Sequence, residues 1–191
     1  MTKIRKKRRF QIAFFGDGEI KKTDSTFIDA YDTAQLLAKH KFTVINGGGP
    51  GVMLASTLGA VSVNGKTKVV VIKDGHQPPK HYEGQHPENT ANAKKIITLK
   101  SYSGRLRKLI NLADAYVIFY GGTGTLAEMT YVWSEAKFAY PKYKPVIFYG
   151  KKWRKIINTL SQELNLEKKE QSICRFAKNP EEVLKIIQDS L

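Results

Sequence analysis

Cysteine and acidic residues are scarce in this 191-residue chain, and long apolar runs are absent. The single cysteine, Cys174, excludes an intramolecular disulfide framework and favours a reducing, cytoplasmic compartment. No apolar run approaches the roughly 18 residues that span a bilayer, so we expect no membrane partner. The basic N-terminus is not followed by the apolar segment of a secretory signal before Asp17.

Positive residues greatly outnumber negative ones. There are 32 Lys and Arg against 17 Asp and Glu, which gives a formal net charge of +15. Six of the positive residues lie in the first nine: Lys3, Arg5, Lys6, Lys7, Arg8 and Arg9. We expect residues 1–9 to form a disordered basic arm and residues 10–191 to form one domain. The arm could follow the phosphates of a nucleic acid, but it has no interleaved aromatic residues for base stacking, so a solvated tail is favoured.

Short apolar runs alternate with helical patterns along the rest of the chain. The runs lie at residues 10–15, 42–45, 69–72, 96–99, 115–119 and 145–149. Helical faces between and after them include Phe27, Ala30, Tyr31, Ala34 and Ala38; Leu106, Leu109, Ile110 and Ala113; and Val183, Leu184, Ile187 and Leu191. Continuous apolar strands are typical of a sheet that is covered on both faces. The alternation predicts an α/β fold with a single doubly wound, mostly parallel, Rossmann-like sheet.

One polar segment interrupts this alternation. Residues 74–93 have no periodicity and carry three prolines. A loop of this length in a compact domain is usually functional, and we interpret it as a lid over a bound base. Its histidines, His76, His81 and His86, recur every five residues, which matches no standard metal-ligand spacing, so we predict no metal and no other cofactor.

Three glycine-containing turns follow predicted strands. They are Gly16-Asp17-Gly18, Gly47-Gly48-Gly49-Pro50-Gly51-Val52-Met53 and Gly121-Gly122-Thr123-Gly124-Thr125. Glycine lets a backbone approach a phosphate closely, and a helix N-terminus that follows directs N–H groups at the anion. Because ligands of such sheets bind beyond the carboxyl ends of the strands, these turns predict a shared anion pocket. No lysine follows the glycines as in a Walker A loop, and the first turn lacks a complete G-x-G-x-x-G pattern.

Two of these turns resemble the signatures of a known family. The run from Gly47 to Met53 is similar to the GGGxxGxM stretch of the LOG family, and Gly121 to Glu128 is similar to its (P)GGxGTxxE signature. The resemblance extends from about residue 10 to residue 150. The family includes cytokinin-activating phosphoribohydrolases and nucleotide nucleosidases, and it was long labelled lysine decarboxylase-like. That label finds no support here, because no lysine stands out as a candidate for a pyridoxal Schiff base.

The resemblance implies an activity and a set of site residues. The activity is hydrolysis of the N-glycosidic bond of a nucleoside 5′-monophosphate, which releases the free base and ribose 5-phosphate. The implied catalytic pair is Glu128 and Arg105, with Arg107 as the alternative arginine and Lys108 as a further phosphate contact. A carboxylate suits this chemistry because oxocarbenium character develops at C1′ as the base departs. The family also implies a homodimer that packs through the helix carrying Glu128.

The chain departs from the family pattern at two positions. Tyr120 stands where the signature usually has proline, and Asp17 stands where a serine is common. An Asp17 carboxylate would repel a phosphate, so it better suits a ribose hydroxyl or a backbone cap. These departures leave two alternatives to hydrolysis open: a non-catalytic nucleotide or molybdenum-cofactor carrier, and a nucleic-acid-associated protein that uses the basic arm.

Overall fold

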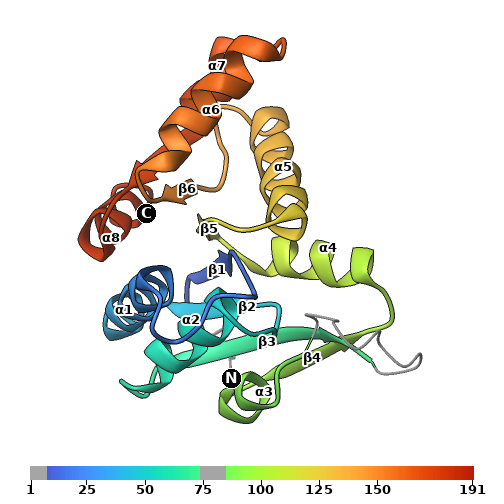
Figure 1. Ribbon diagram of the computed structural model, residues 1–191, viewed down its shortest axis with the longest axis vertical. Helices are drawn as coiled ribbons and strands as arrows, with labels where there is room; N and C mark the ends of the chain where they lie inside the picture. The colour runs from blue at the N-terminus through green and yellow to red at the C-terminus, as the bar shows by residue number, and fades with distance from the viewer. Residues whose placement is uncertain (1–7, 74–84) are drawn as a thin grey trace, which may run out of the picture.

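The fold is built on one parallel sheet. The computed structural model describes residues 8–73 and 85–191. Its strands are β1 (Gln11–Phe15), β2 (Thr43–Asn46), β3 (Lys66–Ile72), β4 (Ile96–Leu99), β5 (Ala115–Ile118), β6 (Val146–Tyr149) and β7 (Cys174–Ala177). Their order is β4-β3-β2-β1-β5-β6-β7, and every neighbouring pair is parallel (Figure 1). The prediction of a doubly wound α/β sheet is confirmed.

Helices cover both faces of this sheet (Figure 1). One face carries α1 (Ser25–Lys39), α2 (Val52–Val61) and α8 (Pro180–Gln188), and the other carries α4 (Tyr102–Leu112), α5 (Thr123–Phe138), α6 (Lys152–Glu163) and α7 (Lys168–Ile173). The short helix α3 (Pro87–Asn92) packs beside α2. Side chains of β1 show the division: Ile12 and Phe14 belong to the first core, and Ala13 and Phe15 belong to the second. Both faces are therefore buried, which explains the uninterrupted apolar strands.

Three local predictions differ from the structure. The sequence pattern did not indicate β7, because only the two end residues of this short edge strand are buried and the exposed Arg175 interrupts its apolar run. The segment predicted as a loop contains helix α3, which begins at Pro87. Leu191 was assigned to the buried face of the last helix, but α8 ends at Gln188 and Leu191 is 73% exposed.

Parts of two predictions lie outside the described residues. Residues 1–7 of the basic arm are among these, as are residues 74–84 of the predicted lid with His76 and His81. In the described ranges, no helix has both the length and the apolar character needed to cross a membrane.

Candidate functional site

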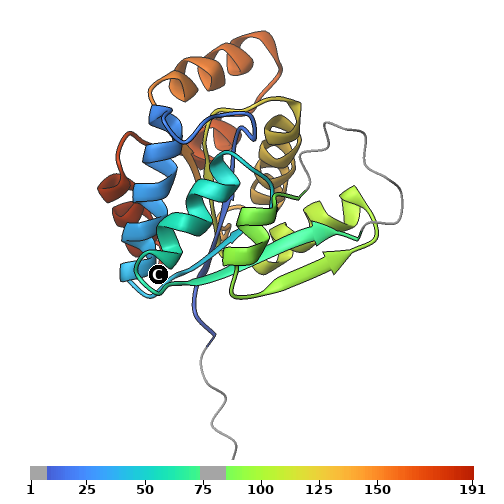
Figure 2. The ribbon, with the colours of Figure 1, turned by 60° about the horizontal axis from the view of Figure 1, so that its bottom comes forward.

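The three glycine turns meet at the carboxyl edge of the sheet. The backbone N–H of Asp17, after β1, donates to the carbonyl of Tyr120, after β5, at 2.9 Å. The carbonyl of Asp17 accepts the N–H of Val52, at the start of α2, also at 2.9 Å. The first turn is thus held between the other two. In Figure 2, β1 starts at the lower end of the sheet and this turn emerges at the upper end.

Glycine is required where these turns touch. Gly51 has a φ of 59°, and a Cβ at this position would overlap the Asp17 carbonyl and the backbone of Gly18. A Cβ at Gly121 would overlap the Thr125 hydroxyl and approach the Asp17 nitrogen to 2.8 Å. Side chains at these positions would force the turns apart. The glycines therefore bring three backbone segments into direct contact.

Arg105 is the buried cation of the site. Its side chain reaches from α4 to the turn after β2 and is only 6% exposed. Nε donates to the carbonyls of Val70 and Gly47 at 3.0 and 3.2 Å, and Nη2 donates to Gly47 at 2.8 Å. Nη2 also lies 3.6 Å from the Met53 sulfur. Nη1 makes no hydrogen bond to any described residue. The guanidinium thus stabilises the Gly47 turn through Nε and Nη2.

The other two basic candidates on α4 lie differently. Arg107 is exposed and Lys108 is half-buried. Arg107 projects roughly 200° around the helix from Arg105, because each residue of an α-helix turns the direction by about 100°. Neither side chain hydrogen-bonds to the glycine turns within the described part of the chain. The structure therefore brings Arg105, and not Arg107, to the turns.

Glu128 lies on the buried face of α5. It is 9% exposed, and Thr125 on the same face is 4% exposed. Gly122 is the N-cap of this helix and provides no side-chain cap, while Thr123 and Gly124 are exposed. The N–H groups of a first helical turn have no partner within the helix and carry partial positive charge. Glu128 therefore lies about one and a half turns along the helix from an anion bound at this helix start.

Helices α4 and α5 approach each other at this point. The Tyr102 hydroxyl, from the first turn of α4, lies 4.0 Å from where a Cβ of Gly124 would stand. Figure 1 shows α4 beside the amino-terminal end of α5. The first turn of the helix that carries Arg105 thus lies beside the first turn of the helix that carries Glu128.

A second polar network holds the Gly48-Gly49 backbone, and the sequence analysis did not identify it. Asn46 accepts the Gly48 N–H at 2.8 Å, while the Asn89 side chain donates to the Gly49 carbonyl at 2.7 Å. The His86 N–H donates to the Gly48 carbonyl at 2.8 Å. Asn46 precedes the glycines directly, so a local turn cap was a usable signal. Asn89 and His86 stand about 40 residues away, and no pattern in the sequence connects them to the turn.

Two buried atoms of this network lack a partner. Asn89 Oδ1 and His86 Nδ1 form no hydrogen bond to the described residues. A buried polar atom without a partner costs about 1–3 kcal/mol.

The two departures from the family pattern have structural partners. Asp17 Oδ1 accepts the N–H of Glu19 at 2.8 Å, which is the backbone cap foreseen as one of its alternatives. The Tyr120 hydroxyl accepts the N–H of Lys152 at 2.6 Å, and its ring stacks on Trp153. Tyr120 therefore connects the turn after β5 to the start of α6.

The described residues contain no cluster of three or more His, Cys, Asp or Glu side chains that could hold a metal ion. Cys174 is buried in the core, and burial raises the pKa of its thiol to about 12. A thiol held protonated in this way is a poor nucleophile.

Comparisons with known proteins agree with this fold. An uncharacterized protein of Archaeoglobus fulgidus is 30% identical over 142 residues, which cover 73% of this chain and 84% of that protein. The molybdenum cofactor binding protein of Rippkaea orientalis has a similar structure, with a TM-score of 0.71 and 21% identity over 96% of this chain and 98% of its own. The molybdenum cofactor carrier protein of Chlamydomonas reinhardtii follows with a TM-score of 0.69 and 18% identity, over 95% of this chain and 98% of its own. The family described as "Possible lysine decarboxylase" matches residues 53–187. The chain therefore belongs to this family, the LOG family, as its two glycine signatures indicated.

Proposed function

We propose that this protein hydrolyses the N-glycosidic bond of a nucleoside 5′-monophosphate. The observation that carries the proposal is the position of Glu128, buried about one and a half helical turns beyond the uncapped start of α5. A 5′-phosphate bound by the N–H groups and hydroxyls of Thr123 and Thr125 would bring the sugar toward this carboxylate. The turns around Gly47, Gly51 and Gly121 would provide further backbone contacts.

The proposed reaction cleaves the bond between C1′ and the base nitrogen. As the base leaves, positive charge develops at C1′, and the Glu128 carboxylate stabilises it and orients the attacking water. Water adds its oxygen to C1′ and loses a proton, the departing base nitrogen takes up a proton, and the products are the free base and ribose 5-phosphate. Arg105 stays charged throughout, so it cannot act as a general acid. Its Nη1 would instead bind the phosphate or the departing base.

The test compares variants of two glutamates on the same helix. Purified protein is incubated with AMP, GMP, CMP and UMP, and the released base is measured by chromatography. Glu128→Gln should lower kcat by about 100-fold or more while nucleotide-dependent thermal stabilisation persists. Glu135→Gln is the matched control, because Glu135 lies on α5 and is exposed. Equal base release in both variants would exclude Glu128 as the catalytic carboxylate, and no release from the unmodified protein with any of the four nucleotides would exclude the hydrolase.

A second candidate is a non-catalytic carrier of a nucleotide or of the molybdenum cofactor. The two similar solved structures are described as proteins that bind or carry that cofactor. The same glycine turns would hold its phosphate, and turnover would be absent. Thermal stabilisation by a nucleotide or by the cofactor, without base release from any nucleotide, supports the carrier over the enzyme. We place either activity in the cytoplasm.

A further inference from the structure

A row of cations lines the edge of the sheet opposite the glycine turns. In a parallel sheet all strands start at the same edge, and this edge of β1, β2, β3 and β4 is rich in lysine and arginine. The exposed residues at or next to these strand starts are Arg8, Arg9, Lys39, Lys41, Lys66, Lys94 and Lys95, and Lys68 is half-buried among them. Figure 2 shows the starts of β3 and β4 at the lower end of the sheet, together with the start of β1.

Little negative charge offsets this row. Among the described residues, Arg8 pairs with Asp114 at 2.5 Å, and the other seven cations form no ion pair. The opposite end of the sheet differs, because there Lys137 pairs with both Glu167 and Glu170. The positive charge on the β1–β4 half of this edge is therefore mostly unpaired among the described residues.

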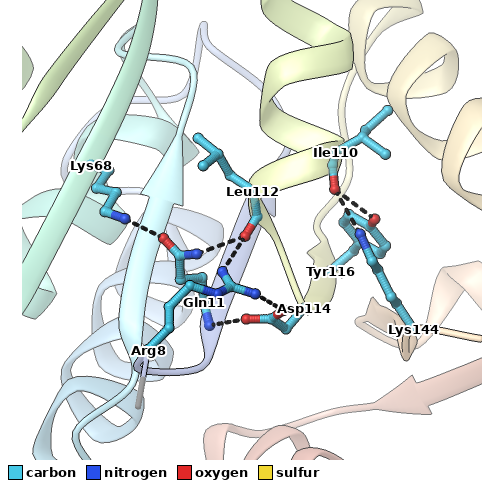
Figure 3. Close-up of polar contacts among 8 residues, drawn as sticks. All are labelled: Arg8, Gln11, Lys68, Ile110, Leu112, Asp114, Tyr116 and Lys144. Atoms are coloured by element: carbon cyan, nitrogen blue, oxygen red, sulfur yellow. Dashed lines mark hydrogen bonds and ion pairs between the residues drawn. The ribbon is translucent and has the colours of Figure 1, made fainter. Parts of the chain in front are cut away.

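Hydrogen bonds fix part of the row in place (Figure 3). Arg8 donates to the Leu112 carbonyl at 3.0 Å in addition to its contact with Asp114. Gln11 donates to the same carbonyl at 2.8 Å and accepts from Lys68 Nζ at 2.5 Å. The start of β1 and the start of β3 are thus connected through Gln11.

The cations lie close enough to repel one another. The pKa of Lys68 is lowered, first by burial and then by the positive charges of Lys95 and Arg8; Asp114 opposes this lowering, and Lys66 adds a smaller lowering effect. A polyanion on this edge would relieve that repulsion. The nearby rings of Phe10 and Phe42 pack on each other, with centroids 5.8 Å apart. Because these rings do not face outward to stack on bases, phosphate contacts would be the main source of binding energy.

We propose that this edge binds the phosphate backbone of a nucleic acid, independently of the nucleotide site. Adjacent strands lie about 4.8 Å apart, so four strand starts span roughly 14 Å. A DNA strand carries one phosphate per about 3.4 Å along the helix axis, so the row covers roughly four phosphates. Contacts to phosphates carry no sequence information, and binding is therefore sequence-independent.

The experiment measures fluorescence anisotropy of labelled single-stranded DNA, RNA and duplex DNA over a range of salt concentrations. For about four phosphates, log affinity should fall against log salt with a slope of about −3 to −4. The variant Lys66→Glu/Lys94→Glu/Lys95→Glu should bind about ten-fold more weakly or worse, and with a shallower slope. The charge-matched control is Lys151→Glu/Lys155→Glu/Lys168→Glu, in exposed positions on or beside α6 and α7, and it should stay within about two-fold of the unmodified protein.

Two further measurements separate folding and activity from binding. The variant Lys66→Gln/Lys94→Gln/Lys95→Gln removes the cations without introducing repulsion, and thermal unfolding verifies that all three triple variants are folded. Base release from nucleotides should be the same in Lys66→Glu/Lys94→Glu/Lys95→Glu as in the unmodified protein. Base release therefore tests the hydrolase proposal, and oligonucleotide affinity tests this one. The proposal is wrong if both glutamate triples lose affinity equally, since net charge alone would then explain binding. It is also wrong if the protein binds phosphatidylserine vesicles but none of the oligonucleotides.

Discussion

At the scale of single residues, the site depends on the pairing of a glycine with a buried arginine. Arg105 can donate to the Gly47 carbonyl because no side chain occupies the space above that glycine. A Cβ at Gly47 would overlap the guanidinium and also approach the Met53 sulfur to 3.0 Å. The first glycine of the signature therefore makes room for the arginine, and it does so without a positive φ.

Gly47→Ala should accordingly displace Arg105. Because the displaced guanidinium loses hydrogen bonds to Gly47 and Val70, we expect the free energy of unfolding to fall by about 2–4 kcal/mol. Base release should be lost with it. Chemical denaturation and chromatography measure the two effects.

Gly122→Ala is the matched control. A Cβ at Gly122 would meet no atom within 4 Å, and its φ of −84° is accessible to alanine. The expected change in stability is within about 0.5 kcal/mol. Similar destabilisation by both alanines would show that the Gly47 effect does not arise from contact with Arg105.

At the scale of elements, helix α6 illustrates a cap supplied from a distant part of the chain. Its first turn has no acidic residue, and its N-cap, Lys151, makes no side-chain cap hydrogen bond. The Tyr120 hydroxyl, about 30 residues earlier, accepts one of the orphan N–H groups instead. The tyrosine that replaces the proline of the signature thus stabilises the helix that follows β6.

Tyr120→Phe removes this acceptor and keeps the ring on Trp153. We expect a loss of about 0.5–1.5 kcal/mol in the free energy of unfolding, measured by urea denaturation. Base release should change little, because Tyr120 contributes to the glycine turns through its backbone carbonyl. A loss of activity without a loss of stability would instead assign the hydroxyl a role in the reaction.

At the scale of the whole molecule, the parallel sheet separates two surfaces of different character. Its carboxyl edge gathers glycine turns, and its amino edge gathers cations. A third surface is the outer side of α5, where Tyr131 is 38% exposed and Phe138 is 84% exposed. Phe138 and Tyr140 are exposed in the single chain, whereas Trp133 on the same helix as Phe138 is buried.

The exposed side of α5 is the surface we propose for a homodimer. Tyr131 and Phe138 lie two turns apart on one stripe of the helix. Light scattering should then give about twice the chain mass of 21.5 kDa, and Tyr131→Glu/Phe138→Glu should give a monomer because charge would be buried at the interface. Ile28→Glu, on α1 and 49% exposed, is the control and should remain dimeric. A monomeric unmodified protein would contradict the proposal.

What the sequence could predict depends on how far apart in the sequence the contacting residues stand. Six strands were predicted because each is a short apolar run in one stretch of chain, and β7 was missed because exposed Arg175 interrupts its pattern. The meeting of the glycine turns was also predicted, since strands of a parallel sheet all end at the same edge. The contacts of Asn89 with Gly49 and of Arg105 with Gly47 were not, because 40 and 58 residues separate the partners.

The sequence by itself determined the layered fold, the position of the glycine turns and the excess of positive charge. Each of these depends on residues close together in the chain or on the rule that parallel strands start at one edge and end at the other. Only the tertiary structure decided which side chain braces which turn and which cations become neighbours. Those relations depend on how helices cross the sheet and how strands are ordered within it, and both are settled by packing between segments that are distant in the chain.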